Sequence, residues 1–281
     1  MSKVSLQRPV MMFLVFALFA WLSVVIQWEA GLGADALTAV TIILYVVIFA
    51  TLLIFLRQDG ERVDSLGFRV AGSGKVLLFS AFLGIFFQIL WMIIASAATG
   101  AVFDFSATPA GTFLVSVLVN AVLVAFVEEC AFRGYIQRKF TGAYGPLQAI
   151  VVTAILFMLP HIQVYSYMKL TDPAIQLAQG ITAAQAADVI LIQAAQTITV
   201  ITGLGIFTGY MYHESGQSIF PPVLLHMMFN IGGLLVLSYS NIPAAVLALG
   251  AASVIVLMIV WVLIDVALIW AAAKILYPKK D

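Results

Sequence analysis

The sequence predicts an all-α integral membrane protein, a polytopic bundle of about eight transmembrane helices with both termini in the cytoplasm. Hydrophobic residues make up 63% of the 281 residues and charged residues only 9%, whereas a soluble domain carries about 25% charged residues. The apolar residues fall in runs near the ~20 residues that cross a bilayer. Composition and segment length together indicate that most of this chain lies within a lipid bilayer.

The predicted spans are separated by short connections that carry glycine or proline. The first span ends without a small-residue cleavage site, so we interpret it as a retained helix and not as a signal peptide. The loop at 57–75 is predicted to be an interfacial segment, and 166–187 is too polar to span and predicts a short amphipathic helix on the outer surface. The spans cover about 10–28, 36–56, 76–98, 112–133, 147–165, 188–212, 219–239 and 243–273.

The orientation follows from the basic residues, because short cytoplasmic loops hold the excess of Lys and Arg. With the N-terminus inside, 12 of the 13 basic residues fall on the inner side, and only Lys169 falls outside. This asymmetry remains when Arg133 is counted as buried. The inner-side residues are Lys3, Arg8, Arg57, Arg62, Arg69, Lys75, Arg133, Arg138, Lys139, Lys274, Lys279 and Lys280.

Charge and cysteine content exclude several classes of function. The formal net charge is zero and no basic tract is present, so nothing indicates a nucleic-acid partner. The single cysteine, Cys130, excludes an intrachain disulfide and a cysteine-based metal site.

Two adjacent acids, Glu128 and Glu129, end the fourth span, where ionisable residues are costly and usually functional. Glu128 lies 16 residues before Tyr144 and His161 lies 17 residues after it. At a rise of 1.5 Å per residue, both lie about 25 Å from the turn between two antiparallel helices. We therefore expect the carboxylate and the imidazole to lie side by side, provided that both helices are continuous.

Helical spacing makes the two acids unequal. Glu129 and Arg133 are four residues apart and are predicted to form an intrahelical ion pair, which makes Glu129 an orienting residue. Glu128 points about 100° away and has no cation on its own helix, so it is the candidate general base.

His226 and Asn230 on the seventh span share one helix face. Each polar residue alone has a structural explanation. His161 could be a core histidine bonded to a backbone carbonyl, His226 and Asn230 could link helices, and Phe157 is predicted to be packing. The convergence of the acid pair with two of the three histidines favours a functional site.

The motifs Glu-Glu-x-x-x-Arg (128–133), Phe-x-x-x-His (157–161) and His-x-x-x-Asn (226–230) occur in this order on successive spans. This order resembles the CPBP intramembrane proteases, the family of the type II CAAX prenyl endopeptidase and of bacteriocin-immunity ("Abi") proteins. The strings FVEECAFRGYIQ, GPLQAIVVTAILFMLPH and GIFTGYMYHESGQSIFPPVLLHMMFN are also similar to the family.

The resemblance implies a glutamate-dependent endopeptidase whose site opens to the cytoplasmic side. Glu128 and His161 would activate a water molecule, and His226 and Asn230 would stabilise the oxyanion; Glu129, Arg133 and Phe157 would support them.

The chain would be one membrane domain, 1–281, with N-terminal helices in 1–111, a catalytic core at about 112–235 and a C-terminal helix in 243–281. The polar stretch 166–187 departs from the family pattern.

Other functions stay open at this point. A zinc enzyme would use Glu128, His161 and His226, although no His-Glu-x-x-His motif is present, so no cofactor is the favoured expectation. A non-catalytic scaffold, immunity or regulatory protein would keep the same fold, and a transporter would need polar residues across both halves of the membrane. The expected substrate is a peptide or protein, with prenylated C-terminal peptides as the family's example. The membrane would be the cell membrane in a prokaryote or the endoplasmic reticulum in a eukaryote.

Overall fold

A computed structural model of the chain describes residues 6–70 and 74–276. The described part is helical, without strands, and contains seven helices that are long and apolar enough to cross a membrane. The predicted polytopic helical bundle is therefore confirmed. The predicted inner-side residues Lys3, Lys279 and Lys280 lie outside the described residues.

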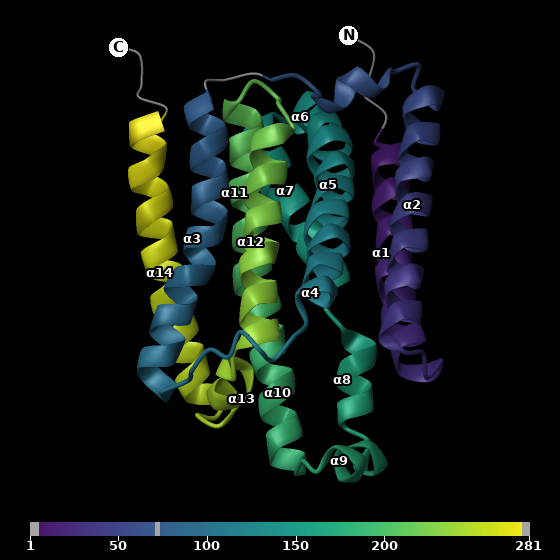
Figure 1. Ribbon diagram of the computed structural model, residues 1–281. Coiled ribbons are helices and arrows are strands. Elements are labelled where there is room, and N and C mark those ends of the chain that lie inside the picture. The colour runs from purple at the N-terminus through teal and green to yellow at the C-terminus, as the bar shows by residue number, and fades with distance from the viewer. Residues whose placement is uncertain (1–5, 71–73, 277–281) are drawn as a thin grey trace.

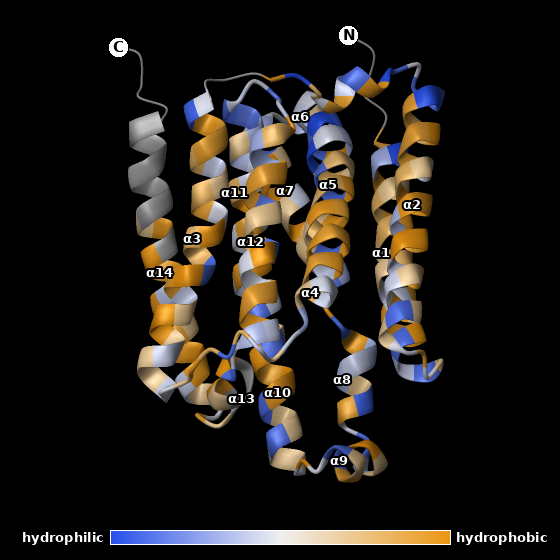
Figure 2. Ribbon diagram, viewed as in Figure 1, coloured by the Kyte–Doolittle hydropathy of each residue, from blue (hydrophilic) through white to orange (hydrophobic). Residues whose placement is uncertain are grey.

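The first seven predicted spans each correspond to one of these helices, and the membrane helices stand side by side as one bundle (Figure 1). Hydrophobic residues cover most of their length (Figure 2). Their bounds are α1 (Gln7–Glu29), α2 (Ala34–Gln58), α3 (Gly74–Thr99), Ala110–Tyr144, Pro146–Leu170, Ala183–Glu214 and α12 (Phe220–Tyr239).

The eighth predicted span, 243–273, is not one helix. A short helix, α13 (Ile242–Leu247), precedes α14 (Ala251–Leu276). Between them Gly250 has a φ of +76°, a conformation that glycine adopts without strain and other residues rarely do. The chain therefore turns before α14, which is apolar over Ala251–Ile264.

The fourth span extends well past its predicted end at residue 133. It runs through α4 (Ala110–Ser116), the π-helical η2 (Val117–Leu123), α5 (Val124–Glu129), the π-helical η3 (Cys130–Gln137) and α6 (Arg138–Tyr144). Arg133 is fully buried inside the bundle, so it does not belong to a cytoplasmic loop. π-helical turns of this kind occur often at functional sites.

The two polar segments, 57–75 and 166–187, contain short helical elements. In the 57–75 loop, the 3₁₀ turn η1 (Val63–Leu66) buries Leu66 completely, so this loop packs onto protein and not only along the lipid interface. The 166–187 stretch contains the end of α8 (Val164–Leu170), all of α9 (Pro173–Gln179) and the start of α10 (Ala183–Gln196), which together project from one end of the bundle (Figure 1).

Glycines on α3 and α12 set the position of the helix that carries His226. A Cβ atom on Gly84 would lie 2.2 Å from the carbonyl oxygen of Leu225. A Cβ atom on Gly232 would lie 2.4 Å from Cβ of Gln88. Any side chain at either position would force the helices apart, so the close approach of α12 to α3 depends on both glycines.

Candidate active site

The acid pair ends α5 and is almost completely buried. The exposed fraction is 2% for Glu128 and 0% for Glu129. Buried carboxylates need hydrogen-bond or ionic partners, because burying an unpaired charge is costly. The partners of the two acids come from different helices, so the two carboxylates are not equivalent.

Glu129 belongs to an ion-paired network. Its Oε2 lies 3.1 Å from Nε of Arg133, which confirms the predicted pair four residues apart. Nε and Nη2 of Arg133 also donate to Oγ1 of Thr208, at 2.9 and 2.6 Å. Thr208 lies on α11 (Thr202–Glu214), and the Arg133 guanidinium lies 4.8 Å from the centre of the Phe157 ring. These contacts fix the guanidinium between three helices.

His226 is the second partner of Glu129, which the helical spacing did not predict. Its Nδ1 lies 2.9 Å from Oε1 of Glu129. Because a carboxylate accepts, Nδ1 carries a hydrogen, and Nε2 is the atom that faces Glu128, 3.8 Å from Oε2. This separation is longer than a hydrogen bond. The cluster of two carboxylates and Arg133 is electrically balanced when the His226 ring carries both of its protons.

Glu128 is held at one oxygen and unpartnered at the other. The Tyr45 hydroxyl donates to Oε1 at 2.6 Å, and Oε2 is buried without a hydrogen-bond partner among the described residues. Tyr45 lies on α2, 83 residues earlier in the chain. A single tyrosine in an apolar run is typical of packing, so no local pattern indicates this contact.

His161 does not lie on a continuous helix, as the height calculation had assumed. α7 (Pro146–Met158) ends before it, and Leu159–His161 forms a 3₁₀ turn, η4. Pro160 lacks the N–H that would continue the helical hydrogen bonds, which accounts for the break. Nδ1 of His161 lies 2.8 Å from the carbonyl oxygen of Phe157. Since a carbonyl only accepts, Nδ1 carries a hydrogen, and in the neutral ring Nε2 has a lone pair.

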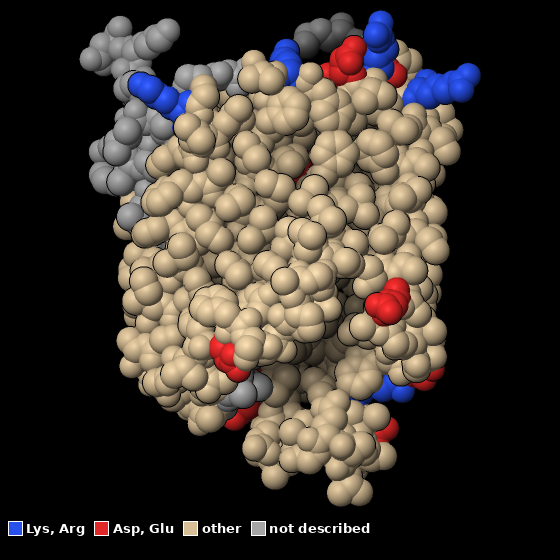
Figure 3. All heavy atoms as spheres, viewed as in Figure 1, with Lys and Arg blue, Asp and Glu red and all other residues tan. Residues whose placement is uncertain are grey.

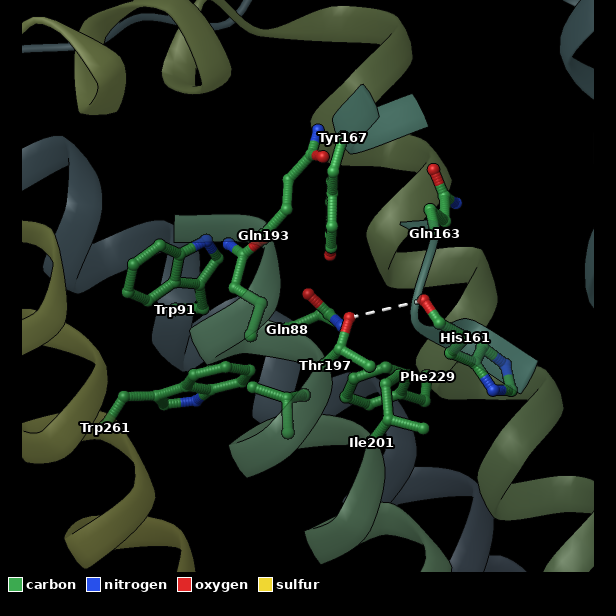
Figure 4. Close-up of a pocket in the computed structure, with 12 residues that line it drawn as sticks. Gln88, Trp91, His161, Gln163, Tyr167, Gln193, Thr197, Ile201, Phe229 and Trp261 are labelled. Atoms are coloured by element: carbon green, nitrogen blue, oxygen red, sulfur yellow. Dashed lines mark hydrogen bonds between the residues drawn. The ribbon is translucent and has the colours of Figure 1, made fainter. Parts of the chain in front are cut away.

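Despite this break, His161 and Glu128 share one cavity. The cavity has a volume of about 210 Å³, and its lining includes Tyr45, Ser23 and Gln163. His161 also lines a second cavity of about 350 Å³ on its other side (Figure 4). The carboxylate and the imidazole that were expected to lie side by side thus line one common cavity.

The side chains of Asn230 and His226 do not contact the same group. Its Nδ2 donates to the carbonyl oxygen of Asn120 in the π-helical segment η2, at 3.2 Å. The predicted oxyanion donors thus have different protein partners, Glu129 for His226 and Asn120 for Asn230, and both partners lie on the fourth span. Asn120 is a further residue that spacing on one helix could not reveal.

Phe157 packs at the centre of the site and is fully buried. Its ring centre lies 5.1 Å from that of Phe132, 5.0 Å from that of His161 and 5.7 Å from that of His226. The last contact is edge-on, at 84°, a favourable arrangement for aromatic rings. Phe157 therefore holds both imidazoles and Arg133 in place, which extends its predicted packing role.

The donor set for a zinc ion is not assembled. No three His, Cys, Asp or Glu side chains of the described residues lie close enough together to hold a metal ion. His161 and His226 each use Nδ1 on an oxygen and leave Nε2 available, as metal ligands do, but Glu128 does not complete a set with them.

A family model described as "Type II CAAX prenyl endopeptidase Rce1-like" matches residues 109–232. Residues 109–232, the part of the chain similar to this family, are called the Rce1-like domain below. The match confirms the resemblance seen in the three motifs, all of which lie within it. Neither a curated protein nor a solved structure gives a significant match. The Rce1-like domain contains both acids, both histidines and Asn230, whereas Tyr45 lies outside it.

Proposed function

We propose that this protein is a glutamate-dependent intramembrane endopeptidase. One observation carries the proposal: Glu128 has one oxygen fixed by Tyr45 and one buried oxygen without a hydrogen-bond partner among the described residues, and it lines the same cavity as His161. A positioned carboxylate beside an imidazole with a free Nε2 suits the activation of water. The Rce1-like match supports a membrane peptidase.

In the proposed reaction, a water molecule binds in the shared cavity between Oε2 of Glu128 and Nε2 of His161. Glu128 takes one proton as the water oxygen attacks the carbonyl carbon of the substrate. The proton then passes to the leaving nitrogen as the C–N bond breaks. The products are a carboxylic acid and an amine, and the carboxylate of Glu128 is restored.

The negative charge on the substrate oxygen needs hydrogen-bond donors. We assign this role to Nε2 of a protonated His226 and to Nδ2 of Asn230, which exchanges its bond to Asn120 for one to the oxyanion. Glu129 accepts from Nδ1 of His226 and so fixes the orientation of the ring, while Arg133 fixes Glu129. These two residues act as positioning residues, as their spacing predicted.

The position of the cavities indicates the side of the membrane from which a substrate would reach the site. Both cavities that contain His161 are lined by parts of the bundle near α8 and α10, such as Ser23 on α1 and Gln193 on α10. Most of the Lys and Arg side chains visible in Figure 3 lie at the other end. We therefore propose that this basic end faces the cytoplasm and that substrate enters from the opposite half, instead of through the expected cytoplasmic opening.

The test compares peptides released from membranes of cells that produce the wild type or Glu128→Gln, identified by mass spectrometry. The control is Glu214→Gln, which changes an exposed acid outside the site. We expect a set of peptides that disappears with Glu128→Gln and persists with Glu214→Gln. Synthetic versions of these peptides, with and without a prenyl group, would then show whether prenylation matters. An unchanged peptide set would refute the proposed activity.

A second candidate is a non-catalytic membrane scaffold, immunity or regulatory protein. The observation in its favour is that the buried polar network joins α2, α5, α11 and α12, which a structural role alone would explain. Full cellular function of Glu128→Gln would support it. The zinc enzyme, the third candidate, would lose activity on chelation and regain it on addition of zinc.

A further inference from the structure

The cavity of about 350 Å³ beside His161 is lined mainly by uncharged polar and aromatic groups (Figure 4). No Lys, Arg, Asp or Glu is among its lining residues. Its volume falls in the usual range for ligand pockets, about 300–1,000 Å³. The polar and aromatic lining residues are Gln88, Gln163, Gln193, Gln196, Thr197, Tyr167, Trp91, Trp261 and Phe229.

These amides are not all satisfied by the protein. Oε1 of Gln193 is buried and has no hydrogen-bond partner among the described residues. Gln88 is buried, and its Cβ lies where a side chain on Gly232 would collide with it. A buried amide at membrane depth needs a partner, which a lipid tail cannot provide. The cavity therefore suits a polar occupant better than a prenyl or acyl chain.

Glutamine amides offer both donors and acceptors, and so do the N–H and C=O groups of an extended peptide. The indoles of Trp91 and Trp261 add flat apolar surface for small side chains. A charged side chain would lose its hydration here without gaining an ionic partner. The lining thus favours a peptide segment without charged residues.

This cavity and the cavity of the proposed site share lining residues. His161 and Gln163 line both cavities, and Oγ1 of Thr197 donates to the His161 carbonyl at 3.5 Å. We propose that this amide-lined cavity binds the uncharged peptide segment that flanks the bond cleaved at Glu128 and His161. This inference rests on the proposed function and adds the substrate class.

The test uses full-length Glu128→Gln protein in lipid nanodiscs, so that binding is observed without cleavage. The probe is a blocked peptide of Ala, Ser and Gln with a central photo-reactive benzoylphenylalanine; a matched peptide carries Lys or Asp on each side of it. We expect the neutral probe to cross-link to cavity residues of α3 and α10, and the charged probes to give about tenfold less product. Equal labelling by charged and neutral probes, or cross-links confined to other helices, would overturn the inference.

Variants add a second measurement. Gln193→Leu removes one cavity amide and should reduce the yield with the neutral probe severalfold, whereas Gln148→Leu, at an exposed glutamine on α7, should leave it unchanged. If Gln193→Leu does not fold, the inference is still tested by the positions of the cross-links and by the comparison of neutral with charged probes. Both measurements use protein whose cavity lining is unaltered. If Glu128 is required for cleavage but the probe binds elsewhere, only this inference fails. If Glu128 is dispensable, the proposed function fails instead.

Discussion

Tyr45→Phe removes one hydroxyl from the site and leaves the ring. The hydroxyl donates to Oε1 of Glu128 at 2.6 Å, the short distance expected for a hydrogen bond to a carboxylate. Such bonds contribute about 1.5–3 kcal/mol. If that energy holds Glu128 in its working orientation, losing it slows the chemical step by roughly 10- to 150-fold. We expect kcat to fall within this range while KM stays nearly constant, because Tyr45 contacts the base and not the peptide.

The assay is cleavage of a synthetic substrate by purified protein in nanodiscs, with kcat and KM determined separately. Tyr144→Phe is the matched control, since it removes the same hydroxyl from an exposed tyrosine at the end of α6. Thermal unfolding should show that both variants remain folded. A Tyr45→Phe enzyme with kcat within about twofold of the wild type would refute the orienting role. A change confined to KM would show instead that Tyr45 contributes to substrate binding.

Two further predictions concern stability. Glu129→Gln removes the carboxylate that Arg133 and His226 share, and leaves a buried guanidinium without its ion pair, so we expect a loss of about 3–5 kcal/mol in thermal unfolding; a variant as stable as the wild type would contradict the ion-pair assignment. At the basic end, burial raises the pKa of the Glu61 carboxyl, but hydrogen bonds and ion pairs from Arg138 and Lys139 outweigh this and lower the pKa overall. Its stabilising contribution is therefore present above the unfolded pKa of about 4.3 and is lost as the pH falls through the lower folded value. Unfolding measured from about pH 6 to pH 3 should show this loss in the wild type and a smaller one in Glu61→Gln; identical pH profiles would exclude Glu61 as the cause.

The spans were predictable because length and hydropathy alone decide which segments can cross a bilayer. Contacts along one helix were predictable as well, and the Glu129–Arg133 pair follows from spacing of four residues. The break at His161 had a visible signal in Pro160, but a height calculation that assumes a straight helix ignores it.

Contacts between distant segments were not predictable from one sequence. Tyr45 meets Glu128 across 83 residues, and Asn230 meets Asn120 across 110. Neither pair has a local pattern, because each depends on how whole helices are placed. The same holds for Thr208, whose hydroxyl holds Arg133 from another helix 75 residues away.

The hairpin of α1 and α2 has a consequence for how relatives of this protein can diverge. It precedes the Rce1-like domain, yet it supplies Tyr45 and one wall of the cavity at Glu128. Residues 109–232 alone would keep every motif and lose the phenol and that wall. Exchanging this hairpin between homologues would thus change the contact to Glu128 and the shape of its cavity while every motif stayed the same. Two chains with identical motifs need not be equally active.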